Sequence, residues 1–397
     1  MLRFVKILLL LLPAFSKAQQ LGFALEQINS QIIIDQKLTG KGVKVGVIDG
    51  GFLNANKEES LAHIFADKLI AGYRDFIDST DFPYSGSKAL DDGHGTEVLE
   101  LIAGYNQKKS VQYGLATEAM YYLARTDHGG YERRSEEENA IKAMEWMASN
   151  GVKIINISLG YNYGYSRKAE NYVQSDIDGR STILTQAVDR ISEEYGILFI
   201  VAAGNDGSKK WRILGSPADA KAALTVGASK FKIWDEAGYS SRGPEWLEYV
   251  KPEVTCFASS GTSFSTPIIT GLAACLLQRN PKLSGAALKE VIIKSCKLSL
   301  PNNYIGYGPP DAEIALSIVS SDAVPEKKEI NSTRKVHKIE LKTPVPYVAV
   351  YHQNGWVVKE KVVKRLKKNS FRVRRNKISN SCTIISQHQQ FQIVWQE

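Results

Sequence analysis

The stretch that decides the fold of this 397-residue chain reads Val43-Lys44-Val45-Gly46-Val47-Ile48-Asp49-Gly50-Gly51. Residues 43–48 are mostly apolar and β-branched, which is typical of a strand buried on both faces of a parallel sheet. Asp49 follows directly, and the two glycines after it allow a tight turn. Because ligands of open α/β sheets bind beyond the carboxyl ends of the strands, Asp49 is a candidate site residue.

Similar apolar runs recur along the chain and alternate with helical patterns. Further buried strands are predicted at 119–124, 153–159, 197–202 and 223–226. Apolar residues at helical spacing predict helices that open at His94 and that cover 136–149, 181–195, 264–279 and 285–294, the last capped by Ser284. Pro267 is expected in the first turn of its helix, where no intrahelical N–H is required. Strands alternating with helices indicate an α/β fold with a doubly wound, mainly parallel sheet.

Three more segments place a polar group beside glycine. They are Asp92-Gly93-His94-Gly95-Thr96, Ala202-Ala203-Gly204-Asn205-Asp206 and Gly261-Thr262-Ser263-Phe264-Ser265-Thr266-Pro267. A serine hydroxyl needs a base within hydrogen-bond reach, and His94 can take the proton of Ser263. Asp49 can hold the imidazole in the right tautomer. The Asn205 amide can donate to an oxyanion together with the backbone N–H of Ser263.

In the chain order Asp, His, Asn, Ser, these segments resemble those of the subtilisin-like serine peptidases, over roughly residues 40 to 320. The resemblance implies an exported serine endopeptidase that works through an acyl-enzyme on protein or peptide substrates. It makes Asp49, His94 and Ser263 the catalytic triad and Asn205 the oxyanion donor. No cofactor is required for this chemistry, a structural calcium ion is left open, and its ligands are unknown.

The resemblance also extends to substrate binding. Ser158-Leu159-Gly160 is similar to the strand that lines the first specificity pocket in this family and pairs with the substrate backbone. Asp206 would lie at the rim of that pocket, where an acid mildly favours a basic or neutral residue before the scissile bond. Two alternatives stay open: a narrow-specificity tripeptidyl-type peptidase, and a peptide-binding pseudoprotease that keeps the cleft.

Two features depart from the family pattern. Only about 30 residues separate Ala18 from Asp49, too few for the inhibitory prodomain that family members carry there. The stretch from Val254 to Gly261 is also unusually short. Neither departure removes a catalytic group.

Residues 1–18 have the pattern of a secretory signal peptide. Arg3 and Lys6 precede an apolar core over 7–12, and Ser16-Lys17-Ala18 offers a cleavage site. The protein is therefore expected in the periplasm, on the outer surface or outside the cell. Export permits disulfides, so the pairing of four cysteines stays open, although Cys275 looks like a core residue: Cys256, Cys275, Cys296 and Cys382.

The formal net charge of +8 is unevenly distributed along the chain. Residues 1–18 carry +3, the predicted catalytic domain over 19–322 carries −6, and residues 323–397 carry +11. Such asymmetry marks separate units, and we expect a linker at 323–330 and a basic, β-sandwich-like domain at 331–397. Within it, Asn354-Gly355 predicts a hairpin turn. The hairpin weakly resembles C-terminal modules of secreted Bacteroidetes enzymes, and the basic charge suits an anionic cell surface. Nucleic acid is not expected, because a β core explains the aromatic residues better than base stacking.

Overall fold

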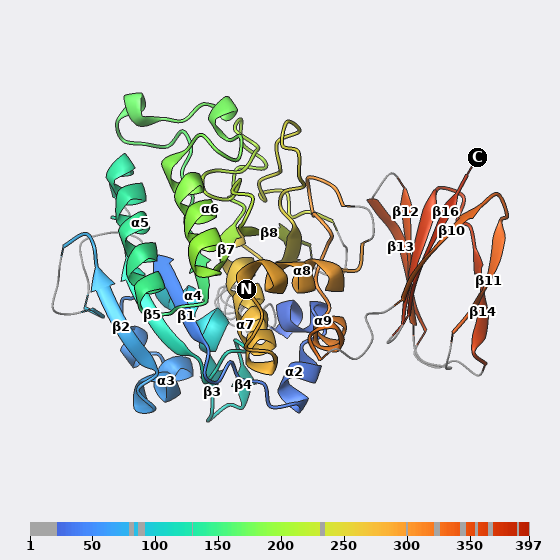
Figure 1. Cartoon of the computed structure of the whole chain (residues 1–397), viewed down its shortest axis with the longest axis horizontal. Helices are drawn as coiled ribbons and strands as arrows, with labels where there is room; N and C mark the ends of the chain where they lie inside the picture. The colour runs from blue at the N-terminus through green and yellow to red at the C-terminus, as the bar shows by residue number, and fades with distance from the viewer. Residues whose placement is uncertain are drawn as a thin grey trace, which may run out of the picture.

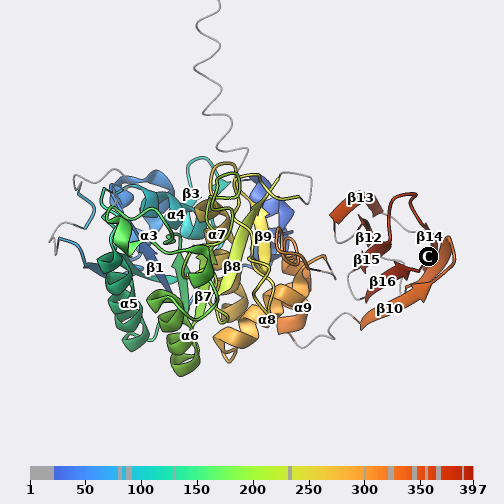
Figure 2. The ribbon, with the colours of Figure 1, turned by 90° about the horizontal axis from the view of Figure 1, so that it is seen from above.

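A computed structural model describes residues 22–78, 83–85, 92–128, 130–230, 235–298, 301–320, 326–341, 347–353, 356–363, 368–386 and 389–396. The predicted signal peptide (1–18) and the Asn354-Gly355 turn lie outside these ranges. Two parts are visible in Figures 1 and 2: an α/β part (residues 22–320) and, to one side of it, a β part (residues 326–396).

The α/β part is organised around a seven-stranded sheet with the strand order β2-β5-β1-β6-β7-β8-β9. Every pair of neighbours in it is parallel. The strands are β1 (Lys44–Asp49), β2 (Ile70–Asp75), β5 (Met120–Arg125), β6 (Ile154–Ile157), β7 (Leu198–Ala202), β8 (Leu224–Ser229) and β9 (Val254–Phe257). The predicted doubly wound sheet is thus confirmed, and five of its strands fall on the five predicted runs. A short antiparallel ladder pairs β3 (Tyr105–Asn106) with β4 (Val111–Gln112).

Helices cover both faces of the sheet (Figure 1). One apolar core joins the sheet to α5 (Arg134–Ser149) and α6 (Ile183–Tyr195). The other core contains α4 (His94–Ala103), α7 (Thr262–Arg279), α8 (Gly285–Ser295) and α9 (Ala312–Val319), with α2 (Gln31–Asp35) and α3 (Ala62–Ala66) beside them. Four 3-10 turns lie in the connections, at Ala55–Lys57, Glu59–Leu61, Lys168–Glu170 and Gln174–Asp176. The Ser284 side chain caps α8 as predicted, since its oxygen accepts from the backbone N–H of Ala287.

The central helix α7 is buried along nearly its whole length. It begins at Thr262, so Pro267 lies in its second turn, and the expectation of a first-turn proline is wrong. The missing N–H of Pro267 deprives the carbonyl of Ser263 of its intrahelical donor. The hydroxyl of Ser158 donates to that carbonyl at 3.2 Å instead. This contact links the segment after β6 to the first turn of α7.

The β part contains a five-stranded sheet in the order β10-β16-β15-β12-β13 and a two-stranded sheet of β11 and β14. Its strands are β10 (Glu326–Ser332), β11 (Val336–Glu340), β12 (Tyr347–Gln353), β13 (Trp356–Val363), β14 (Ser370–Arg374), β15 (Ser381–Ser386) and β16 (Gln389–Trp395). Strands β12 and β13 pair antiparallel up to Gln353 and Trp356, as the hairpin pattern predicts. The two sheets share one apolar core, which is sandwich-like.

Strand β10 differs from expectation, because it occupies part of the predicted linker (323–330). It pairs in parallel with β16 from Glu326 to Ser332. Its Glu-Lys-Lys-Glu sequence is polar enough to suggest a linker, but charged residues are also typical of sheet edges, and β10 is an edge strand. Residues 323–325 lie outside the described ranges.

All four cysteines lie within the described residues, and all are buried and free. Burial raises the pKa of the Cys256 thiol to about 12. They are therefore core residues in this structure, as predicted for Cys275. Among the helices that the structure describes, none has the length and apolar character needed to cross a membrane.

Candidate active site

Asp49 and His94 form a close pair at the carboxyl edge of the sheet. Asp49 ends β1 and is fully buried, and its Oδ1 lies 2.7 Å from Nδ1 of His94. The backbone N–H of Gly50 donates to the same oxygen at 2.8 Å. A hydrogen bond from Nδ1 to a carboxylate fixes the tautomer of a neutral imidazole and puts the lone pair on Nε2. In that tautomer, Nε2 of His94 is the ring nitrogen that can accept a proton.

Glycine allows α4 to approach β1 this closely. A Cβ on Gly95 would lie 2.4 Å from the Gly51 carbonyl oxygen and 2.9 Å from the Cβ of Asp49. At Gly93, on the other side of His94, a Cβ would meet nothing within 4 Å. Close packing is therefore required on one side of the histidine only.

Arg125 supports this pair, and the sequence did not point to it. It is buried at the end of β5, in register with Asp49. Its Nε donates to the Gly50 carbonyl at 3.2 Å, and its Nη1 donates to Asp75 at 3.0 Å. Its Nη2 lies 3.6 Å from Oδ1 of Asp92, in the segment before His94. One guanidinium thus ties together the ends of β1 and β2 and the entrance to α4. The sequence did offer one signal for Arg125, because it is a charged residue at the end of an apolar strand. A buried charge must be paired, so acidic partners could have been expected nearby.

Ser263 and Asn205 face a common point beside Gly261. A Cβ on Gly261 would lie 3.2 Å from Ser263 Oγ and 3.6 Å from Asn205 Nδ2. The oxygen of the Asn205 amide accepts from the Thr262 backbone N–H at 2.9 Å and from the Thr262 hydroxyl at 3.2 Å. That hydroxyl in turn accepts from the N–H of Gly204 at 3.0 Å. Because Thr262 engages the oxygen, the amide nitrogen is directed toward the serine.

The two halves of the site meet at the start of α7. The rings of His94 and Phe264, the residue after Ser263, lie 5.5 Å apart between centroids. All four predicted triad and oxyanion residues therefore gather around the first turn of this helix, although they come from α4, α7 and the ends of β1 and β7.

A cavity of about 310 Å³ opens beside Ser263. The structure brings all the predicted substrate-binding residues to its wall, together with Ser263 and Asn205: Ser158, Leu159, Gly160 and Asp206. Asn162 and Lys209 also line it and were missed, because neither belongs to a glycine-flanked motif.

The charge of Asp206 is offset within the cavity. Lys209 Nζ lies 2.8 Å from its Oδ1, and Asn162 Nδ2 donates to its Oδ2 at 2.6 Å. Both oxygens are thus engaged by the protein. Of the two substrate residues expected beside Asp206, basic or neutral, this pairing favours the neutral one, and the preference stays a prediction.

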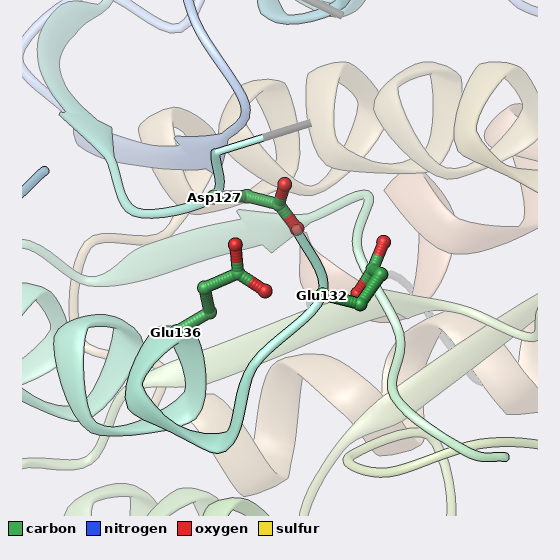
Figure 3. Close-up of side chains that lie close together, drawn as sticks. All are labelled: Asp127, Glu132 and Glu136. Atoms are coloured by element: carbon green, nitrogen blue, oxygen red, sulfur yellow. The ribbon is translucent and has the colours of Figure 1, made fainter. Parts of the chain in front are cut away.

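A second cluster of acids lies past the end of β5. Asp127, Glu132 and Glu136 place carboxylate oxygens within 4.8 Å of one another (Figure 3). Burial, and then the nearby charge of Asp127, raise the pKa of Glu136 to about 7. Carboxylates are the groups that hard cations prefer.

Comparison with known proteins identifies the family. Residues 40–308 match the family model described as the subtilase family. The chain is 30% identical to Subtilisin E of Bacillus subtilis (strain 168) over 306 residues, which cover 74% of this chain and 71% of that protein. It is 29% identical to Subtilisin of Bacillus pumilus over 301 residues, 73% of this chain and 97% of that protein.

Solved structures share the fold. The crystal structure of MycP1 from Mycobacterium smegmatis superposes with a TM-score of 0.55 at 22% identity and covers 74% of this chain and 84% of that one. The prenylagaramide maturation protease PagA gives a TM-score of 0.53 at 21% identity, over 73% of this chain and 98% of that one.

Proposed function

Because the chain belongs to the subtilase family of serine-type endopeptidases, we propose that it hydrolyses peptide bonds through an acyl-enzyme on Ser263, with His94 as the base and Asp49 as its partner. The observation that carries the assignment is the 2.7 Å contact between Asp49 Oδ1 and His94 Nδ1. This pair lies next to the start of α7, where Ser263 lines the cavity of about 310 Å³.

In the first half-reaction Ser263 Oγ attacks the scissile carbonyl carbon while His94 Nε2 takes the hydroxyl proton. The carbonyl oxygen becomes an oxyanion, which accepts from Asn205 Nδ2 and from the backbone N–H of Ser263. That N–H belongs to the first turn of α7, where N–H groups have no intrahelical acceptor. His94 then gives the proton to the leaving amine as the C–N bond breaks, and the acyl-enzyme remains.

In the second half-reaction water replaces the amine. His94 takes a proton from the water, whose oxygen attacks the ester carbonyl, and the same two donors stabilise the second oxyanion. Collapse returns the proton to Ser263 Oγ and releases the acid. Every proton moves through His94, and Asp49 stabilises the imidazolium each time. The steps use protein groups and water alone.

Substrate binding is assigned to the segment Ser158-Leu159-Gly160 and to the cavity beside it. This segment leaves the sheet after β6, so its backbone groups can pair with an extended peptide. The contact between the Ser158 hydroxyl and the Ser263 carbonyl supports a fixed distance between this wall and the nucleophile. The cavity would receive the side chain before the scissile bond, with Asp206 neutralised at its rim.

Export and surface contact are part of the proposal. The signal pattern at 1–18 supports export, and the +11 charge of residues 323–397 supports contact with an anionic cell surface. Binding of the full chain to anionic vesicles should then weaken steeply between low and physiological salt. Salt-independent binding would contradict the electrostatic contact.

The catalytic assignment is tested with Ser263→Ala and with Ser265→Ala as a matched control. Ser265 is two residues away on the same helix, and its hydroxyl donates to the Thr262 carbonyl at 3.0 Å. The Ser263 variant should lose fluorophosphonate labelling and peptide hydrolysis and keep its melting temperature, whereas the Ser265 variant should retain labelling. Turnover by Ser263→Ala at the wild-type rate would exclude the assignment. Internal cleavage of peptides with a blocked N-terminus distinguishes a general endopeptidase from a tripeptidyl-type enzyme.

A further inference from the structure

The small sheet of the β part brings two basic segments of the chain side by side. Strands β11 and β14 pair antiparallel, from Val336 opposite Arg374 to Glu340 opposite Ser370. Residues 333–339 and 370–380 together contain seven lysines and arginines and neither aspartate nor glutamate. The ladder therefore concentrates on one small sheet a positive charge that the sequence divides between two stretches.

Most of these bases face solvent. Among the described residues, the side chains of Arg372, Arg374 and Lys377 form no ion pair with an acid. Lys338 pairs with Glu340 on its own strand, but it lies directly opposite Arg372, and like charges at opposed positions destabilise a sheet. We refer to the six exposed bases, together with Ile378, as the basic patch: Arg334, Lys335, Lys338, Arg372, Arg374 and Lys377.

An exposed apolar side chain lies among these bases. Ile378 is 54% exposed and follows Lys377 in a tight turn after β14. The backbone N–H of Ser379 closes this turn by donating to the Asn376 carbonyl at 3.2 Å. A base and a branched apolar side chain are thus presented next to each other at the tip of the turn.

The start of β11 lies beside this turn. The backbone N–H of Arg375 donates to the Lys335 carbonyl at 2.8 Å. Val336, the next residue, is 37% exposed and lies opposite Arg374. This end of the ladder therefore combines positive charge from both segments with two exposed apolar side chains.

We propose that the basic patch binds the anionic headgroups of a lipid membrane, with Ile378 entering the interface beside them. The proposal rests on the surface contact proposed above for the β part, and it names the residues and the partner of that contact. Lysine and arginine are attracted to anionic lipids, and an apolar side chain that enters the interface adds to the binding. A soluble polyanion would pair with the bases but gain nothing from Ile378, so the exposed isoleucine favours lipid.

The position of the small sheet suits this role. Strands β11 and β14 lie at the side of the β part that is farthest from the α/β part (Figure 1). Binding through the basic patch would thus keep the α/β part, and with it the cavity beside Ser263, away from the membrane and open to substrate.

The test is binding of the full chain, at physiological salt, to vesicles of equal parts phosphatidylcholine and phosphatidylglycerol, followed by co-sedimentation. Arg374→Gln combined with Lys377→Gln removes two charges from the basic patch. Lys361→Gln combined with Lys368→Gln is the matched control, since it removes the same charge from exposed positions elsewhere in the β part. Melting and fluorophosphonate labelling are measured on each protein and should not change.

The double variant in the patch should bind the vesicles about 10- to 30-fold more weakly than the parent. The control should bind within about threefold of the parent, because charges far from the contact are screened. Ile378→Ser should also weaken binding to the vesicles and leave binding to dextran sulfate, a soluble polyanion, unchanged.

Three results would overturn the proposal, and they differ in what else they exclude. Equal vesicle binding by the parent and the patch variant would reject the basic patch alone, and the wider surface contact would stand. Binding of the parent to dextran sulfate but not to vesicles would replace the membrane with a soluble polyanion as the partner. A parent that binds neither probe would exclude the proposed surface contact as well, whereas the catalytic assignment is tested separately by the labelling of Ser263.

Discussion

Thr262 donates to the amide oxygen of Asn205, so the amide nitrogen is the group left to donate to an oxyanion in the proposed mechanism. Asn205→Ala should lower kcat by about 100- to 1000-fold with little change in KM, because the donor is needed only when charge develops on the carbonyl oxygen. Asn162→Ala is the control: Asn162 lines the same cavity and donates to Asp206, so its loss should act mainly on KM. Steady-state kinetics on one peptide separates the two, and a loss confined to KM in Asn205→Ala would assign that residue to binding.

Lys251 is a buried cation outside the site, and it predicts a pH dependence of stability. Its Nζ donates to the Ala223 carbonyl at 2.8 Å and lies 3.0 Å from Oε1 of Glu253. Burial outweighs this ion pair and lowers the pKa of Lys251 from 10.5 to about 8. The unfolded chain therefore binds more protons between about pH 8 and pH 10.5, and the free energy of unfolding rises with pH in that window.

Relative to Lys251→Met, the stability of the wild type should increase by up to about 3 kcal/mol from pH 8 to pH 10.5. The stabilisation is complete above pH 10.5 and disappears as the pH falls through 8. Urea unfolding of both proteins at several pH values measures the difference. A difference that is flat over this window would mean that the lysine keeps its proton in the folded state.

The limits of prediction at the residue scale follow from where partners lie in the chain. A single sequence is enough to single out the four proposed catalytic residues, because each lies in a glycine-flanked segment: Asp49, His94, Asn205 and Ser263. Their roles stay predictions until variants are measured. Arg125 has no such motif: two of its partners lie 50 and 33 positions before it, at Asp75 and Asp92, and only the fold brings them together.

Elements differ in how well their sequences reveal them. Strands β1 and β5 to β8 are runs of apolar residues buried on both faces, which is the pattern that predicts them. Strand β2 lies at the edge of the sheet and is only partly buried, so it does not show that pattern. Strand β9 has four residues and directly follows the polar stretch Lys251-Pro252-Glu253, whereas β6, which is equally short, lies within the longer predicted run 153–159. The charged strand β10 is not predicted either, because it also lies at the edge of its sheet and lacks the pattern of a strand buried on both faces. Helix α7 is predicted, but the tolerance of Pro267 in its second turn depends on a hydroxyl from another element.

Because α4 packs closely against β1, we expect opposite effects on activity from substitution of the two glycines beside His94. Gly95→Ala should abolish activity, because its Cβ would lie 2.4 Å from the Gly51 carbonyl oxygen and push the helix, and the imidazole, away from Asp49. Gly93→Ala should remain active, since its Cβ meets nothing within 4 Å and its φ of −88° suits any residue. Fluorophosphonate labelling rates check both, with circular dichroism to confirm folding. Equal labelling of the two variants would show that the helix has room to shift.

At the scale of the whole molecule, the chain has separate apolar cores. The α/β part holds a large one on each face of its sheet and a small one around Ala228, Ala237 and Ala258. The β part holds its own, around Tyr351, Ile384 and Trp395. No residue before Ile330 belongs to the core of the β part among those that the structure describes. The charge division of −6 against +11 follows the same boundary. Cores that share no residues can unfold separately, which supports an independent role for the β part.

A chain that ends at Ala323 should therefore stay folded and cleave a small peptide at a rate similar to that of the full chain. The cut removes the core around Tyr351 and leaves intact every contact of Asp49, His94, Asn205 and Ser263 described above. Its melting transition should match the one assigned to the α/β part in the full chain, and fluorophosphonate should label both proteins equally. The matched comparison is a chain ending at Leu298, which lacks α9 and with it part of the core beneath α7, and which should not fold. If the chain ending at Ala323 aggregates or loses labelling, the β part belongs to the catalytic fold, and its basic charge must be explained by contacts within the protein.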